Sequence, residues 1–161
     1  MVADVNIHEV LERVRSLILA EFPKGLSVQR DYDISLPEFR GDGEQLIQAV
    51  LNIAHNAAQA LAQRRIDDGD ARIVLRTRAA RQVTIGRQRY RLALELHIED
   101  NGPGVPPEIR DRIFFPLVSG REGGSGLGLT LAQDFIQQHH GLIECESEPG
   151  CTLFKIQIPL P

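Results

Sequence analysis

A chain of 161 residues with 42% hydrophobic and 25% charged residues has the size and balance of one soluble globular domain. No apolar run approaches the ~20 residues needed to span a bilayer, and no signal-peptide pattern opens the chain, so we expect a cytoplasmic domain without membrane contact. The net charge of -4 disfavours nucleic acid as a partner, and the arginines of residues 72–91 are interpreted as a solvated sheet edge. Cys145 and Cys151 are expected to be free thiols, and no spacing typical of a structural zinc site is present.

The first elements in chain order are a helix, a strand and a second helix. Apolar residues at helical spacing predict a helix over about residues 7–22, with Asn6 at its N-cap. Alternation then predicts a strand over residues 26–32. A second helix is predicted to begin after Asp42, which is a suitable capping residue, and to run to about residue 63.

The second half of the chain predicts four strands and one long helix. Strands are expected over residues 71–79 and 89–99, followed by a helix over about residues 127–140. Gly141 is expected to end that helix in a left-handed conformation, and two strands flank the turn at residues 149–150. This order predicts an α+β fold, a two-layer sandwich in which helices cover one face of a mixed sheet.

The second helix carries a stripe of amides beside its apolar face. Asn52 and Asn56 are four residues apart and therefore lie one above the other. Their carboxamides can offer oxygens to a hard cation and N–H groups to phosphate oxygens. The alternative is the exposed polar face of an ordinary amphipathic helix, although asparagine propagates a helix poorly at such positions.

A predicted strand ends at the segment Asp100-Asn101-Gly102-Pro103-Gly104. A carboxylate at a strand end can accept a hydrogen bond from the exocyclic amine of adenine. Gly102 and Gly104 would let the backbone approach a flat ligand closely. The alternative is a simple turn, because Asp, Asn, Gly and Pro are the usual turn residues.

A glycine-rich loop opens directly into the last predicted helix. Gly123, Gly124, Gly126 and Gly128 would let successive backbone N–H groups point at one anion, next to a helix N-terminus. The loop lacks the Lys-Ser/Thr pair of a phosphate-binding P-loop, and no strand leads into it as in a dinucleotide-binding turn.

These segments, in this order and with Phe-Phe-Pro at residues 114–116, resemble the nucleotide-binding boxes of the gyrase, heat-shock-90, histidine-kinase and mismatch-repair superfamily. The resemblance covers essentially the whole chain. It implies the histidine-kinase-type ATPase fold, with ATP and Mg²⁺ bound between the helices. It also implies a lid over about residues 105–125. Within that segment, Pro106, Pro107 and Glu108 by themselves predict the first turn of a short helix.

Within the superfamily the chain resembles the histidine kinases. Hydrolysing members place a glutamate where this chain has Asn52, and no acidic residue lies between Gln45 and Ala62, so no base is present there to activate water. The short lid resembles that of the nitrogen-regulation sensor kinases. Residue by residue, the resemblance implies that the nucleotide is contacted by Asn52, Asn56, Asp100, Gly102, Gly104, Arg121, Gly124, Gly126, Leu127 and Gly128.

The same resemblance implies that Asn56 is the Mg²⁺ ligand. Many family members carry a lysine where this chain has Gln59, so Arg121 or His55 is a candidate for compensating phosphate charge. No histidine lies in a convincing acceptor box: His8 precedes a glutamate but no Asn-Pro follows. His97 lies in a predicted strand, and His139 and His140 lie at a helix end.

We therefore expect residues 1–161 to be a single ATP-binding catalytic domain that phosphorylates a histidine on a separate dimerisation domain. The implied partners are that acceptor-histidine domain, an NtrC-like response regulator and a PII-type signal protein, with the isolated domain a monomer. The alternatives are an anti-sigma-factor serine kinase, which keeps an acidic residue at the position of Asn52, and a nucleotide-binding regulatory module without catalysis.

Overall fold

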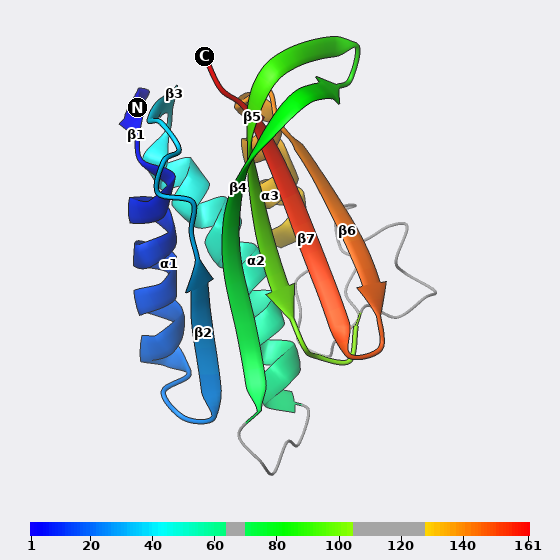
Figure 1. The fold of residues 1–161 in the computed structure, drawn as a ribbon. Helices are drawn as coiled ribbons and strands as arrows, with labels where there is room; N and C mark the ends of the chain where they lie inside the picture. Colours follow the sequence, from blue (N-terminus) through cyan, green and yellow to red (C-terminus); the bar gives the residue numbers. More distant parts are fainter. Residues whose placement is uncertain (64–69, 105–127) are drawn as a thin grey trace.

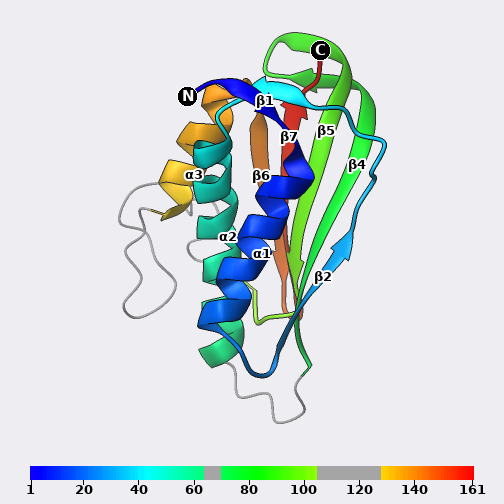
Figure 2. The same cartoon turned by 90° about the vertical axis from the view of Figure 1, so that its left-hand side faces the viewer.

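The computed structural model describes residues 1–63, 70–104 and 128–161, and these residues form two layers (Figure 1). One layer is a five-stranded sheet, and the other consists of helices that all cover the same face of the sheet (Figure 2). The helices are α1 (Ile7–Glu21), α2 (Gly43–Gln63) and α3 (Gly128–Gln138). The predicted two-layer α+β sandwich is confirmed. In the described residues, no helix is both long enough and apolar enough to cross a bilayer.

The sheet is mixed, with the strand order β2-β4-β5-β7-β6. The edge strand β2 pairs with β4 in parallel, and all other neighbouring strands pair in antiparallel fashion. The strands are β2 (Leu26–Asp31), β4 (Ala71–Ile85), β5 (Gln88–Asp100), β6 (Leu142–Glu148) and β7 (Cys151–Pro159). The antiparallel part is built from two hairpins, β4–β5 and β6–β7, which lie side by side.

The hairpin of β4 and β5 is longer than the sequence predicts. Its two strands remain paired up to Ile85 and Gln88, whereas the last pair between β5 and β7 joins Ala93 to Pro159. Arg81 still pairs with Leu92, residues 83–85 pair with residues 88–90, and none of residues 81–91 pairs with β7. Residues 81–91 therefore extend past the sheet, and we call this segment the arm (Figure 1). The interpretation of residues 72–91 as a sheet edge is corrected, because β4 and β5 are inner strands and the edges are β2 and β6.

A separate two-stranded ribbon was not predicted. It pairs β1 (Ala3–Val5) with β3 (Phe39–Gly41) in antiparallel fashion. Each strand has only three residues, which is too short for a period-2 pattern to be recognised. The ribbon lies next to the N-terminal end of α2 (Figure 2).

The predicted N-caps of α1 and α2 are confirmed. Asn6 Oδ1 accepts the backbone N–H of His8 at 2.9 Å, and Asp42 Oδ1 accepts those of Glu44 and Gln45 at 3.1 and 3.2 Å. Each cap satisfies backbone donors that the first turn of a helix leaves without a partner. The side chain of Gln45 reaches α3, where its Nε2 donates to Gln138 Oε1 at 3.0 Å.

The C-terminal end of α3 differs from the prediction by one residue. His140, and not Gly141, has the left-handed conformation, with φ 62°, and the N–H of Gly141 bonds to the carbonyl of Ile136 at 2.9 Å. A glycine is still required at 141, because a Cβ there would lie 2.5 Å from the carbonyl oxygen of Gln157. The reason for this glycine is close packing against β7.

His139 joins α3 to the start of α2. Its Nδ1–H donates to the carbonyl of Phe135 at 2.7 Å, and its Nε2 accepts the backbone N–H of Asp42 at 2.9 Å. A ring nitrogen that accepts a hydrogen bond carries no proton, so this ring is neutral. His139 is therefore a structural hydrogen-bonding group between the two helices. A Cβ on Gly41 would lie 2.9 Å from the ring, so the joint also needs a glycine there.

Replacing His139 by asparagine should destabilise the fold, because the shorter side chain cannot reach the N–H of Asp42. Leaving that donor without a partner costs about 1–3 kcal/mol, which urea unfolding would measure. The matched control is His140→Asn, since His140 is exposed and asparagine tolerates positive φ; its effect should stay within about 0.5 kcal/mol. Equal losses from the two variants would contradict a specific role of His139.

Candidate functional site

Helix α2 places two asparagines beside its buried stripe. Eight of its apolar residues are buried against the sheet and the neighbouring helices: Leu46, Ala49, Val50, Ile53, Ala54, Ala57, Ala58 and Leu61. Asn52 and Asn56 are half-buried and lie one turn apart on the helix. The side chain of Gln48, one turn before Asn52, donates to Asn52 Oδ1 at 2.6 Å, which orients the amide.

Asp100 lies at the end of β5 with its side chain in the core layer. It alternates in phase with Leu96 and Ile98, which face the helices, and it is 7% exposed. Its Oδ1 accepts the backbone N–H of Gly102 at 2.8 Å. A Cβ on Gly102 would lie 2.8 Å from that same oxygen, so a larger residue there would have to displace the carboxylate. The carboxylate and the turn therefore hold each other in place.

Gly104 is required for two separate reasons. Its φ is +90°, a conformation that residues with a Cβ rarely adopt. A Cβ there would also lie 2.9 Å from both the carbonyl oxygen of Glu148 and the hydroxyl of Ser147. The segment after β5 thus passes directly against the β6–β7 turn, to which it is also tied by a bond from Gly150 N–H to the Gly102 carbonyl at 3.1 Å.

Sequence reasoning missed the part played by Asn101. Its side chain acts like an extra residue of β5: Oδ1 accepts the N–H of Arg72 at 2.9 Å, and Nδ2 donates to the carbonyl of Asp70 at 2.6 Å. Its own N–H donates to the carbonyl of Arg72 at 3.3 Å. These bonds extend the β4–β5 ladder beyond Asp100 and fix the position of its backbone. An asparagine directly after a buried acidic strand residue was the available signal.

Thr152 was also missed. It lies directly opposite Asp100 in the β5–β7 register, so both side chains point to the same face of the sheet. It is 5% exposed, and its hydroxyl shares a hydrogen bond of 3.3 Å with that of Ser147. A buried hydroxyl opposite a buried carboxylate makes a polar pair in a layer that is mostly apolar. The position of Thr152 after the turn at residues 149–150 does not indicate a role in the site, because that role depends on how β5 and β7 pair.

The last turn of α2 lies over this corner of the sheet. The Cδ2 atom of Leu61 would be 3.5 Å from a Cβ on Gly102, so the helix and the turn are in near contact. The asparagines of α2 and the Asp100 turn thus belong to adjoining parts of one region.

Gly128 is the first residue of α3, and the other predicted loop contacts lie outside the described residues: Arg121, Gly124, Gly126 and Leu127. The predicted lid over residues 105–125 lies outside them as well.

Two of the described histidines, His55 and His8, bond to side chains on other elements. His55 bonds to Glu21 on α1 at 2.5 Å, and its ring lies edge-on to that of Phe22. His8 bonds to Thr77 Oγ1 at 2.9 Å, and its ring lies against Tyr32. Burial lowers the pKa of His8 below 6.5, despite the opposing charges of Asp33 and Glu12.

Both cysteines are free thiols, as predicted. Burial, with the neighbouring charge of Glu99, raises the pKa of the Cys151 thiol, which keeps it protonated and unreactive at neutral pH. Among the described residues, no three His, Cys, Asp or Glu side chains form a group that would hold a metal. A magnesium ion does not require such a group, because it retains several waters and needs only one or two protein oxygens, often together with substrate phosphates.

A pocket of about 410 Å³ lies at the other end of the molecule, near the base of the arm. Its lining includes Arg40, Gln45, Tyr90 and His139, and none of the predicted nucleotide contacts. The candidate site is instead the region of Asp100 and the asparagines of α2, identified by the chemistry of its side chains and by the close packing of its backbone. It has a buried carboxylate, two glycines at which a Cβ would come too close to neighbouring atoms, and two half-buried amides. These features suit a flat ligand with a charged, oxygen-rich tail.

Residues 41–161 match the family model of histidine kinase-, DNA gyrase B- and HSP90-like ATPases, which covers more than half of the chain. The chain belongs to this family. It is 48% identical over 155 residues to the sensory histidine kinase/phosphatase NtrB of Vibrio alginolyticus, and 50% identical over 155 residues to NtrB of Escherichia coli O157:H7. Each match covers 96% of this chain and 43% of the relative, so the chain spans less than half the length of these curated relatives.

Solved structures show the same fold. The mycobacterial sensor histidine kinase MprB superposes with a TM-score of 0.74 at 24% identity, over 99% of this chain and 97% of that one. Full-length ShkA, solved in complex with AMPPNP, gives a TM-score of 0.76 at 26% identity, over 98% of this chain and 31% of that one. The expected likeness to the catalytic domains of histidine kinases, and to the nitrogen-regulation type among them, is confirmed.

Replacing Gly104 by alanine should cost more stability than replacing Gly150. Both glycines have φ near +90°, so both variants pay about 1–2 kcal/mol of left-handed strain. Only Gly104 also meets a backbone carbonyl at 2.9 Å, whereas the space around Gly150 is open within 4 Å. We expect an extra loss of at least about 1 kcal/mol at 104, measured by urea unfolding. Equal losses would show that the close approach to Glu148 relaxes freely.

Proposed function

We propose that this chain binds ATP with Mg²⁺ and presents the γ-phosphate for transfer to a histidine on another domain. The observation that carries the proposal is the corner in which the buried Asp100 carboxylate is held by Gly102 beneath the end of α2. Family membership and the structure of ShkA with AMPPNP support it. Asp100 would accept a hydrogen bond from the adenine amine, and Thr152 beside it would help to position the base.

The phosphates would lie between α2 and the start of α3. The N-terminus of α3 at Gly128 offers backbone N–H groups and a partial positive charge, which suit an anion. The remaining contacts we propose come from Arg121, Gly124, Gly126 and Leu127. Asn56 would hold Mg²⁺ through its side-chain oxygen, and Asn52 would contact metal or phosphate. The ion, when bound, would neutralise charge on the phosphates.

Transfer to a protein side chain fits this site better than hydrolysis. The segment from Gln45 to Ala62 has no acidic residue, so α2 supplies no carboxylate base for a water molecule. His55 on the same helix is engaged by Glu21. Positioning of the phosphoryl group would be the main contribution of this chain, and a histidine imidazole on a separate dimerisation domain would be the nucleophile.

The particular pathway we propose is nitrogen regulation. The relatives at 48–50% identity are named sensory histidine kinase/phosphatase NtrB, and the identity extends over 96% of this chain. The partners would then be the acceptor-histidine domain of the same kinase, an NtrC-like response regulator and a PII-type signal protein. Residues 1–161 would act as one catalytic domain, monomeric when isolated.

Replacing Asp100 by asparagine should weaken ATP binding with little effect on folding. Asparagine retains an oxygen for the Gly102 N–H but loses the charge that strengthens a bond to an adenine amine. The loss of about 1.5–3 kcal/mol corresponds to a roughly 10–150-fold higher Kd for ATP, measurable by calorimetry. The control is Glu99→Gln, on the opposite face of β5, which should leave the Kd within about twofold. Unchanged affinity in Asp100→Asn would reduce Asp100 to a turn residue.

The chain alone should neither phosphorylate itself nor turn over ATP, yet it should phosphorylate an added acceptor-histidine domain. Radiolabel from ATP, followed on each protein separately, measures this transfer. Asn56→Ala should abolish it by removing the Mg²⁺ ligand, whereas His8→Gln should leave it unchanged, because His8 is a structural partner of Thr77.

Three other outcomes would contradict the proposal in distinct ways. Label on this chain that disappears in His8→Gln would make His8 the acceptor. Rapid ATP turnover by the lone chain would indicate a hydrolysing enzyme despite Asn52. Transfer to a serine of an added anti-sigma-factor antagonist, with none to the histidine domain, would favour the serine kinase.

A further inference from the structure

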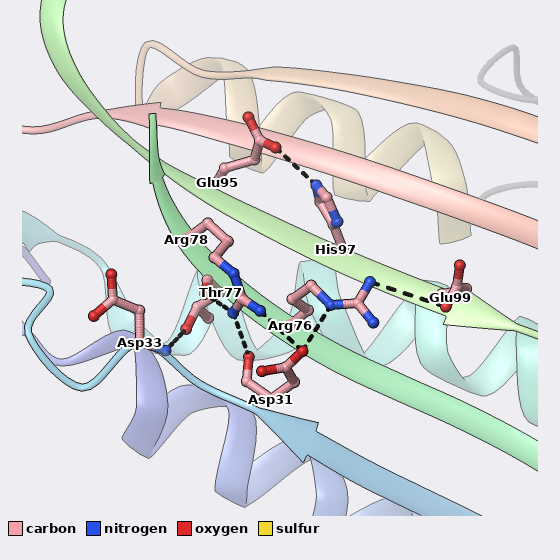
Figure 3. Close-up of polar contacts among 8 residues, drawn as sticks. All are labelled: Asp31, Asp33, Arg76, Thr77, Arg78, Glu95, His97 and Glu99. Atoms are coloured by element: carbon pink, nitrogen blue, oxygen red, sulfur yellow. Dashed lines mark hydrogen bonds and ion pairs between the residues drawn. The ribbon is translucent and has the colours of Figure 1, made fainter. Parts of the chain in front are cut away.

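The face of the sheet that is turned away from the helices carries a network of compensated charges (Figure 3). Arg76 Nε donates to Asp31 Oδ2 at 2.9 Å, and Arg78 donates to the same oxygen at 3.0 Å. These two arginines hold the pKa of the Asp31 carboxyl below its usual value of 3.8. Glu99 lies 4.0 Å from the guanidinium of Arg76. Each arginine in this part of β4 therefore faces a carboxylate on a neighbouring strand.

The pairing of arginines with carboxylates does not continue into the arm. Residues 81–91 contain four arginines and no acidic residue, namely Arg81, Arg87, Arg89 and Arg91. All four are exposed. Arg89 donates to the neutral side chain of Gln82 at 3.1 Å, and no ion pair found in the described residues includes any of the four.

Among the described residues, this concentration of charge contributes no ion pair to the fold. The arm extends past the last β5–β7 pair, so it adds no strand to the sheet, and four like charges on a two-stranded ribbon repel one another. Without these four charges, the net charge of -4 would become -8, so the arm and the rest of the chain have opposite character. At physiological salt, charges act over only about 8 Å, so the arm attracts an anionic surface chiefly at contact.

We propose that the arm is a docking surface for the acidic face of a partner protein. Guanidinium groups form paired, planar hydrogen bonds with carboxylates, and an exposed ribbon can insert its arginines into a compact acidic cluster. A long polyanion fits less well, because only about four of its charges would be neutralised while the rest of this chain is negative. The arm and Asp100 lie at opposite ends of β5, about 25–40 Å apart at ~3.3 Å per residue. The surface is therefore separate from the nucleotide site.

The test uses the 161-residue chain and a fluorescent oligoglutamate peptide as the probe. Arg87→Glu with Arg91→Glu reverses two charges on the arm, and Arg13→Glu with Lys24→Glu makes the same change in net charge at exposed positions elsewhere. We expect the arm variant to raise the Kd for the peptide at least about tenfold and the control variant to change it by less than about twofold. ATP binding should be the same in both variants, so failure here is distinguishable from failure of the nucleotide proposal.

Two results would overturn the proposal. Equal effects of the two variants on peptide binding would mean that only net charge matters. Tighter arm-dependent binding of a short DNA duplex or of phosphatidylglycerol vesicles than of the peptide would assign the arm to nucleic acid or to a lipid surface instead.

Discussion

Packing of α2 on the sheet is the constraint on which the candidate site depends. One stripe of this helix is buried, α1 lies along one side of it, and α3 lies along the other (Figure 2). Because successive residues turn by about 100°, burial of that stripe fixes the direction of every other side chain on the helix. The burial that stabilises the fold therefore also orients Asn52 and Asn56, and a change in helix rotation would move both amides together.

Both ends of α2 are set by contacts that involve backbone atoms. At its start, the N–H of Asp42 is held by His139 at the far end of α3. At its end, Leu61 lies over Gly102, whose N–H holds the Asp100 carboxylate. The helix is roughly 30 Å long. It thus links the corner proposed for adenine with the ribbon of β1 and β3, through one rigid element.

The sequence was sufficient for the features that depend on local pattern. Amphipathic spacing located α1 and α2, and capping residues Asn6 and Asp42 located their starts. Features that depend on partners distant in sequence were missed or misinterpreted. His139 accepts a hydrogen bond from the backbone N–H of Asp42, 97 positions earlier. Gly141 is required because a Cβ there would come too close to the carbonyl oxygen of Gln157. The roles of Asn101 and Thr152 likewise follow from strand register, which no single segment encodes.

The parallel pairing of β2 with β4 has a consequence for how the chain folds. The β4–β5 and β6–β7 hairpins close through short turns, whereas β2 reaches β4 only across the whole of α2. Loop-closure entropy therefore favours early formation of the hairpins and late arrival of β2. Until β2 docks, β4 is an open edge on which other chains could pair. The row of Arg72, Arg76 and Arg78 gives that temporary edge the positive charge by which natural sheets resist aggregation. When β2 docks, Asp31 pairs with Arg76 and Arg78.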